Sequence, residues 1–286
     1  MKTIQLFILT FAISFNVSFA QNNTKEGSKL AFPRTKVVPI KDTKNGRQYD
    51  LYIRLPEKYS KDKATKHPVI YYTDAMWHVE MLSGSTEYIL ENAILVGISW
   101  QTDMNEKSKK ELGAHASRYR DYSMTKSKKP EYQAKYQFGQ ASKHLAFIRN
   151  DVIPYVEKNY RTDAGNRTYY GYSLGGGFGG YILLNQPDTF KNYILGSPSR
   201  GSTPYLVKIG SGAALKGKTL NANVFISYGN KEKVLGERTD KFIAMLKARK
   251  DQSLNLKHIV VGGTHSTAFP MTTVRSIYWL ADLLKK

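Results

Sequence analysis

A serine between two glycines is the first feature that predicts chemistry. Residues Gly171 to Gly175 read Gly-Tyr-Ser-Leu-Gly, a G-x-S-x-G motif, between a run with strand character and a glycine-rich run with helical character. In that setting the serine occupies a sharp, strained turn, and its flanking positions need small residues. We therefore expect Ser173 to be a nucleophile and the backbone amide of Leu174 to be an oxyanion donor. The alternative is a chance match in a chain with 22 glycines.

The same stretch also matches the dinucleotide pattern G-x-G-x-x-G at Gly175, Gly177 and Gly180. The context differs, because a serine turn precedes the first glycine and no acidic residue follows about 20 residues later on a strand. Each glycine inside a helix costs about 1 kcal/mol relative to alanine. We therefore expect these glycines to let the helix pack closely against the sheet behind the serine.

A serine nucleophile needs a histidine that accepts its proton and an acid that orients the histidine. Only His258 and His265 follow Ser173 in the chain. His258 falls inside an expected strand, whereas His265 comes just after it, where the base of such an enzyme lies. The sequence therefore favours His265 as the base.

The acid is expected on the loop after the preceding strand, because the chain order in this architecture is serine, acid, histidine. Glu232 is the first carboxylate after the strand that ends at Tyr228, and Glu237 and Asp240 follow it. We expect Glu232 to be the acid, with Asp240 as the first alternative and Glu237 as another.

A second oxyanion donor is expected from the loop at residues 73–77. The backbone amide of Ala75 or Met76 suits this role, since any residue except proline can donate its amide. Trp77 is expected either to form a wall of the acyl pocket or to be a core aromatic residue. Tyr172, beside the nucleophile, is a further candidate substrate contact.

The elements around these residues alternate between strands and helices. A mostly parallel sheet with helices on both faces is the fold that such alternation predicts. An antiparallel N-terminal edge is expected from two strand-like runs separated by Lys44-Asn45-Gly46. The expected strands are 35–40, 48–55, 69–72, 93–98, 167–172, 192–195, 224–228 and 254–261; the expected helices are 76–91, 140–160 with a kink before Pro154, 174–185, 239–250 and 272–284.

The first twenty residues predict export. Lys2, an apolar run from Ile4 to Phe15 and the small residues Ser18 and Ala20 form a secretory signal peptide, with cleavage after Ala20. A membrane anchor is the alternative, but the run is shorter than the roughly 20 apolar residues of a spanning helix. We expect a polar leader at 21–34, one domain at 35–286, a periplasmic or secreted location, and no integral membrane segment after cleavage.

The composition restricts the chemistry and the partners. The chain has no cysteine, which excludes disulfides and a cysteine nucleophile. The pattern predicts no metal and no cofactor. The net charge is +20, and its lysines are scattered or lie in loops. This distribution is more typical of a solvated surface than of a nucleic-acid groove, so we expect no nucleic-acid partner but an anionic ester substrate remains compatible.

These residues resemble a family of α/β-hydrolase esterases that includes enterochelin-type siderophore esterases, feruloyl esterases and esterase D-like enzymes. The resemblance runs from about Thr35 to the C-terminus, and its anchors are residues 54–56, 68–74, 96–98, 120–123, 171–175, 196–199 and 263–265. It implies ester hydrolysis through an acyl-serine intermediate with Ser173, His265 and an acid at the position of Glu232. The chain has Asp74-Ala75 where Asp-Gly is common in the family.

The resemblance also leaves the substrate open. Siderophore esters in this family are anionic, and glycan-linked esters are the other class that it implies. Arg120, together with Arg118, is a candidate contact for an anionic substrate, although arginines before a tight turn are as often structural. The competing functions are an acyltransferase on the same scaffold and a binding module without turnover.

Overall fold

The computed structural model of the protein describes residues 32–59 and 63–285. The expected signal peptide and almost all of the expected polar leader lie outside these residues. The described residues from Pro33 onward form one compact unit. Within the described ranges, no helix is long and apolar enough to cross a membrane.

One eight-stranded sheet organises this unit, in the order β1-β2-β4-β3-β5-β6-β7-β8. β1 pairs antiparallel with β2 and β2 antiparallel with β4, whereas all later pairs are parallel. The expected antiparallel edge and parallel sheet are therefore confirmed. The strands are β1 (Thr35–Lys41), β2 (Gln48–Arg54), β3 (His67–Tyr72), β4 (Ile94–Ile98), β5 (Thr162–Tyr172), β6 (Asn192–Gly196), β7 (Asn223–Gly229) and β8 (Asn255–Val261).

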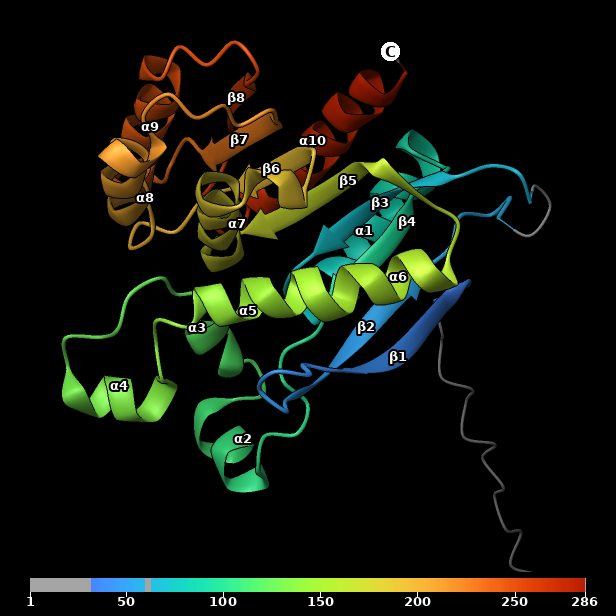
Figure 1. The fold of residues 1–286 in the computed structure, drawn as a ribbon, viewed down its shortest axis with the longest axis horizontal. Helices are drawn as coiled ribbons and strands as arrows, with labels where there is room; N and C mark the ends of the chain where they lie inside the picture. Colours follow the sequence, from blue (N-terminus) through green and yellow to red (C-terminus); the bar gives the residue numbers. More distant parts are fainter. Residues whose placement is uncertain (1–31, 60–62, 286) are drawn as a thin grey trace, which may run out of the picture. The chain divides into compact units, whose positions relative to one another are not determined.

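Helices cover both faces of this sheet, as Figure 1 shows. α1 and α10 lie on one face, where they enclose one apolar core, and α5, α6, α7 and α9 enclose the other. The helices are α1 (Ala75–Ile89), α2 (Glu106–Leu112), α3 (Ser117–Asp121), α4 (Pro130–Tyr136), α5 (Ala141–Phe147), α6 (Ile153–Asn159), α7 (Leu174–Asn185), α8 (Thr203–Gly210), α9 (Lys233–Ala248) and α10 (Ala268–Leu284).

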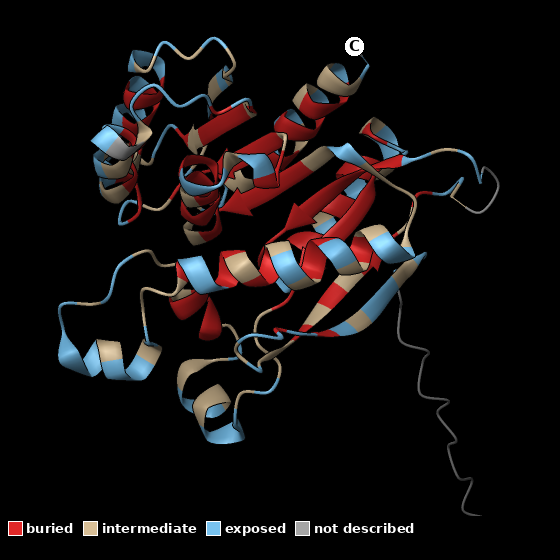
Figure 2. Ribbon diagram, in the orientation of Figure 1, coloured by how far each residue is buried: buried red, intermediate tan, exposed pale blue. Residues whose placement is uncertain are grey.

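The burial of each strand follows its residue pattern. β3, β4 and β6 are buried at every position, as expected for parallel strands covered on both faces. β2 alternates because only one of its faces meets the core. Figure 2 shows the buried residues concentrated in the sheet and on the inner sides of the helices.

The segment between β4 and α5 differs from what the sequence predicts. It contains α2, α3 and α4, which have at most seven residues each, and α2 and α4 bury none of theirs. Short exposed helices leave no apolar periodicity, so the sequence pattern misses them. The expected kink before Pro154 is a five-residue π-helix, Ile148–Val152, that joins α5 to α6. The ring of Pro154 cannot donate a backbone hydrogen bond, which favours such an irregularity.

Candidate active site

Ser173 lies on the turn between β5 and α7, in the strained geometry that its motif predicts. Its φ is 57° and its ψ is −116°, an unusual conformation for a residue with a side chain. A Cβ atom added at Gly171 would lie 2.4 Å from the carbonyl oxygen of Gly175, and one at Gly175 would lie 2.4 Å from Oγ1 of Thr73. Both flanking positions therefore require glycine because other parts of the chain approach them.

The glycines of α7 let the helix approach its neighbours closely. A Cβ atom at Gly176, Gly177, Gly179 or Gly180 would lie within 2.3 to 2.6 Å of an atom of another segment. Gly176 and Gly179 approach the sheet as expected, whereas Gly177 and Gly180 approach Ser202 and Leu206 of the α8 segment. The dinucleotide pattern in the same residues is thus accounted for by packing.

Glu232 and His265 are hydrogen-bonded, with Oε1 of Glu232 2.5 Å from Nδ1 of His265. Glu232 lies between β7 and α9, and His265 lies between β8 and α10. A carboxylate only accepts hydrogen bonds, so Nδ1 carries the proton and Nε2 is left as an acceptor. The side chain of Glu232 is 5% exposed and that of His265 is 44% exposed. This arrangement gives a histidine whose free nitrogen is accessible and able to take a proton.

Backbone hydrogen bonds hold the two loops together. The amide of Asn230 donates to the carbonyl of Val261 at 2.8 Å, and the amide of Lys231 donates to the carbonyl of Gly263 at 3.0 Å. Gly229 permits this approach, since a Cβ atom there would lie 2.5 Å from the carbonyl oxygen of Gly263. The loops after these adjacent parallel strands therefore form one connected support for Glu232 and His265.

Tyr172 connects the nucleophile turn to the base. Its hydroxyl donates a hydrogen bond to the carbonyl oxygen of His265 at 2.7 Å, and the two rings lie 5.3 Å apart. Tyr172 is only 6% exposed, so His265 packs against a buried ring. No hydrogen bond joins Ser173 to His265 among the described residues. In a structure without substrate such a contact is often longer than a hydrogen bond.

Three hydrogen bonds determine the ionisation of Glu232. Burial raises the pKa of this carboxyl, but the hydrogen bonds from His265, the Gly229 amide and the Ser197 hydroxyl outweigh it and hold the pKa below its ordinary value. The amide nitrogen of Gly229 lies 2.6 Å from Oε2, and Oγ of Ser197 lies 2.7 Å from the same oxygen. Glu232 is therefore ionised at neutral pH and oriented at both of its oxygens.

Ser197 is a residue to which sequence reasoning gave no role. It directly follows β6 and is fully buried. In the sequence it belonged only to residues 196–199, one of the segments that resemble the esterase family. Its contact with Glu232 spans 35 positions in the chain, which no local pattern reveals.

The alternative acids and the alternative base lie elsewhere. Both carboxylate oxygens of Asp240 accept from the hydroxyl of Tyr228 at 2.9 Å. Glu237 is exposed on α9. His258 stacks on the ring of Tyr228 at 5.4 Å, and burial lowers its pKa. Of the candidates weighed, Glu232 and His265 are the pair that the structure brings together.

The amides expected to form an oxyanion hole are free. Leu174 is the first residue of α7, and Ala75 and Met76 are the first two of α1. None of their backbone N–H groups donates a hydrogen bond within the described part of the chain. The close approach of Thr73 to Gly175 places the two helix starts side by side. Unpaired amides at helix N-termini attract negative charge.

A buried ion pair fixes the loop that carries Ala75 and Met76. Asp74 has a left-handed φ of 56° and is completely buried. Its carboxylate accepts two hydrogen bonds from Arg118, at 2.8 and 2.9 Å, and a third from the indole nitrogen of Trp100 at 2.8 Å. Burial lowers the pKa of Arg118, but Asp74 outweighs it and raises the pKa above its ordinary value. Arg118 is thus a structural partner of Asp74.

The candidate substrate contacts differ in accessibility. Trp77 is 49% exposed on the first turn of α1, and its ring packs against Trp100 at 4.7 Å and beneath the guanidinium of Arg118 at 5.0 Å. Arg120 is 9% exposed and donates to both carboxylate oxygens of Asp121. Substrate contacts by these residues stay predictions.

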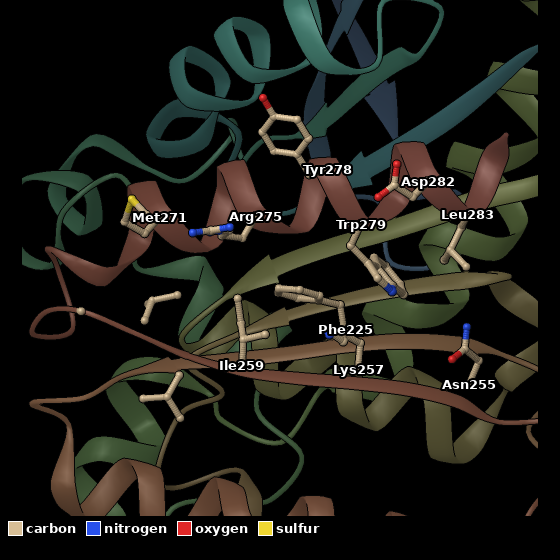
Figure 3. Close-up of a pocket in the computed structure, with 13 residues that line it drawn as sticks. Phe225, Asn255, Lys257, Ile259, Met271, Arg275, Tyr278, Trp279, Asp282 and Leu283 are labelled. Atoms are coloured by element: carbon tan, nitrogen blue, oxygen red, sulfur yellow. The ribbon is translucent and has the colours of Figure 1, made fainter.

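A large groove has Gly262, three positions before His265, in its wall. It has a volume of about 720 Å³ and lies between β8 and α10 (Figure 3), where Trp279, Phe225 and Ile259 point into it. It contains neither the expected nucleophile nor the base. A smaller cavity of about 280 Å³ has Leu174 in its wall. Neither Ser173 nor His265 lines this cavity, but Leu174 directly follows Ser173 on the serine turn. Among the described residues, no group of three His, Asp or Glu side chains is placed to hold a metal ion.

Comparison with known proteins agrees with the fold and the motif. Residues 43–283 match the family model described as "Putative esterase". The chain is 31% identical over 205 residues to the ferri-bacillibactin esterase BesA of Bacillus subtilis (strain 168), covering 65% of this chain and 67% of that protein. Among solved structures, the BES protein of Bacillus cereus has a TM-score of 0.73 at 22% identity, covering 89% and 98% of the two chains.

A siderophore hydrolase, EstB from Aspergillus nidulans, has the same TM-score of 0.73 at 16% identity, covering 89% of this chain and 97% of that one. These structural similarities show that the chain shares the α/β fold of these two proteins. The chain belongs to the esterase family whose model it matches. It is a carboxylic ester hydrolase.

Proposed function

We propose that the protein hydrolyses an iron-siderophore ester through an acyl-serine intermediate, with Ser173 as nucleophile, His265 as base and Glu232 as acid. The observation that carries the mechanism is the 2.5 Å hydrogen bond between Glu232 and His265, on loops next to the strained turn of Ser173. The similarity to a protein named ferri-bacillibactin esterase supports the substrate class.

The reaction follows from this arrangement. Nε2 of His265 takes the hydroxyl proton as Oγ of Ser173 attacks the ester carbon. The free amide of Leu174 and that of Ala75 or Met76 stabilise the oxyanion. The bond to the alcohol oxygen then breaks, and Nε2 returns the proton to that oxygen. Water repeats the sequence on the acyl-serine, releasing the acid and restoring Ser173.

The cavity beside Leu174 supports an anionic substrate with an aromatic part. Tyr132, Phe138 and Tyr205 contribute rings to its wall, and Lys126 contributes a positive charge. The chain as a whole has 43 Lys and Arg residues against 23 Asp and Glu residues. A positive field raises the rate at which a negatively charged substrate arrives.

A comparison of substrates tests this function. Purified protein is assayed on ferri-bacillibactin, the iron-free siderophore, a feruloyl ester and a short-chain nitrophenyl ester, beside Ser173→Ala and Asp240→Asn variants. We expect the highest kcat/KM on the ferric siderophore, loss of activity in Ser173→Ala and wild-type activity in Asp240→Asn. A higher kcat/KM on the feruloyl ester would overturn the substrate class. Full activity of Ser173→Ala would overturn the mechanism.

We also infer that residues 1–20 direct export and that the protein works in the periplasm or outside the cell. Lys2, the apolar run that follows and Ala20 support this. Cell fractionation and the intact mass of the recovered protein test it. The expected mature chain begins at Gln21; a cytoplasmic protein that retains residues 1–20 would contradict the inference.

A further inference from the structure

Ser197 combines an unfavourable backbone with a buried hydroxyl. Its φ is 37°, in the left-handed region that favours glycine, and its side chain is fully buried. Strained residues of this kind persist where the surrounding structure holds them, and they cluster at functional sites. A glycine would adopt this φ without strain, so the feature that distinguishes serine here is its hydroxyl.

That hydroxyl lies at the junction of the three loops that carry the proposed triad. Oγ of Ser197 is 2.7 Å from Oε2 of Glu232 and 2.9 Å from the hydroxyl of Tyr172. Tyr172 precedes Ser173, and its hydroxyl donates a hydrogen bond to the carbonyl oxygen of His265. The Ser197 hydroxyl has one hydrogen and two possible acceptors. It donates its hydrogen bond to the carboxylate of Glu232 and not to Tyr172, because an ionised acceptor forms the stronger hydrogen bond.

We propose that Ser197 is a positioning residue that acts on catalysis through Glu232. Its hydrogen bond, together with that of the Gly229 amide, holds Oε2 from two sides and so fixes Oε1 against Nδ1 of His265. Without the Ser197 hydroxyl, Oε2 keeps only the Gly229 amide as a donor, so the carboxylate is less restrained and orients the imidazole of His265 less precisely. This role rests on the proposed function of the triad.

Two variants separate positioning from stability. Ser197→Ala removes the hydroxyl and keeps the strained φ, whereas Ser197→Gly removes both. We expect both to lower kcat by about 10- to 100-fold, the range for residues that orient a catalytic group, with KM changed by less than about twofold. We expect Ser197→Gly to have a Tm equal to or above that of the wild type despite its low kcat, which a merely structural role does not produce.

A buried serine on the adjacent strand is the matched control. Ser227 is as deeply buried as Ser197, but its hydroxyl pairs with Thr272 at 2.9 Å and not with the triad. We expect Ser227→Ala to keep the wild-type kcat. An equal loss of kcat in Ser227→Ala and Ser197→Ala would overturn the proposal.

A double variant shows whether Ser197 acts through Glu232. In a Glu232→Ala background, we expect Ser197→Ala to lower kcat no further. A further loss as large as in the wild-type background, or wild-type kcat in both Ser197 variants, would overturn the positioning role. If Ser173→Ala and Glu232→Ala themselves keep full activity, the proposed triad is wrong, and this result is distinguishable from a failure of Ser197 alone.

Discussion

The carboxylate of Glu232 meets the imidazole of His265 at 2.5 Å, although 33 positions separate the two residues. The contact exists because β7 and β8 are adjacent parallel strands whose carboxyl-terminal loops share backbone hydrogen bonds. Each of the two loops carries one member of the pair, so neither side chain has to reach across the sheet.

Removing the charge of Glu232 tests this pair directly. We expect Glu232→Gln to lower kcat by about 10³- to 10⁴-fold, because an amide no longer selects the histidine tautomer that accepts the serine proton. Asp240→Asn is the control, since Asp240 bonds to Tyr228 instead. Steady-state hydrolysis of a nitrophenyl ester measures both. A larger loss in Asp240→Asn than in Glu232→Gln would transfer the role of the acid to Asp240.

The lowered pKa of Glu232 also predicts how stability depends on pH. Its pKa in the folded protein lies below the value of about 4.3 expected in the unfolded chain, so its ionisation stabilises the folded state. This contribution is complete above the unfolded pKa and is lost as the pH falls through the folded pKa.

Urea unfolding of wild type and Glu232→Gln at several pH values checks this dependence. We expect the difference in unfolding free energy to be constant near pH 7 and to decrease below about pH 4. The exposed Glu237 provides a control, and Glu237→Gln should differ from wild type by a small amount at every pH. A Glu232→Gln difference that grows with acidification would contradict the sign.

The candidate catalytic residues were easier to predict from the sequence than the residues that hold them in place. Ser173 and His265 follow from local patterns, because a strand-turn-helix serine and a post-strand histidine are visible in a few residues each. Glu232 required the position of a strand end. Ser197 and Gly229 carry no such pattern, since their contacts with Glu232 and with Gly263 join residues far apart in the chain.

Apolar periodicity separates the helices and strands that were predicted from those that were missed. The buried strands and the long helices α1, α7 and α10 have strong apolar patterns, and the structure has them within a few residues of the expected ends. α2 and α4 are short and bury none of their residues, so no periodicity distinguishes them from loops. Tyr132 of α4 lines the cavity beside Leu174, so part of this segment borders that cavity.

Two glycines, one on α7 and one on α1, should respond oppositely to alanine. At Gly175 a Cβ atom would meet Oγ1 of the buried Thr73 at 2.4 Å, whereas nothing lies within 4 Å of one at the exposed Gly84. We expect Gly175→Ala to destabilise the fold by about 1 to 3 kcal/mol through overpacking and to lower kcat. We expect Gly84→Ala to stabilise it by up to about 1 kcal/mol through helix propensity, with kcat unchanged.

Thermal unfolding and nitrophenyl ester hydrolysis measure both glycine variants. Adding Thr73→Ala to Gly175→Ala removes the clashing oxygen and should restore part of the lost stability. Equal stability of Gly175→Ala and Gly84→Ala would contradict the prediction, because it would mean that the serine turn accommodates a methyl group beside Thr73.

The ion pair between Asp74 and Arg118 predicts a loss that a second substitution reduces. Arg118→Met leaves the fully buried carboxylate of Asp74 with only the indole of Trp100 as a partner. An unpaired buried charge of this kind destabilises a protein by about 3 to 5 kcal/mol. We expect kcat to fall as well, since Asp74 holds the loop whose amides are proposed to stabilise the oxyanion.

The double variant Asp74→Asn with Arg118→Met removes both charges, so we expect it to be more stable than Arg118→Met alone. Its kcat should nevertheless stay below that of the wild type, because the neutral pair no longer fixes the left-handed turn at residue 74. Denaturant unfolding and steady-state kinetics on the three proteins separate the two effects. If Arg118→Met keeps wild-type stability and kcat, the ion pair supports neither the fold nor the loop, and the position of Ala75 and Met76 must depend on the packing of α1 alone.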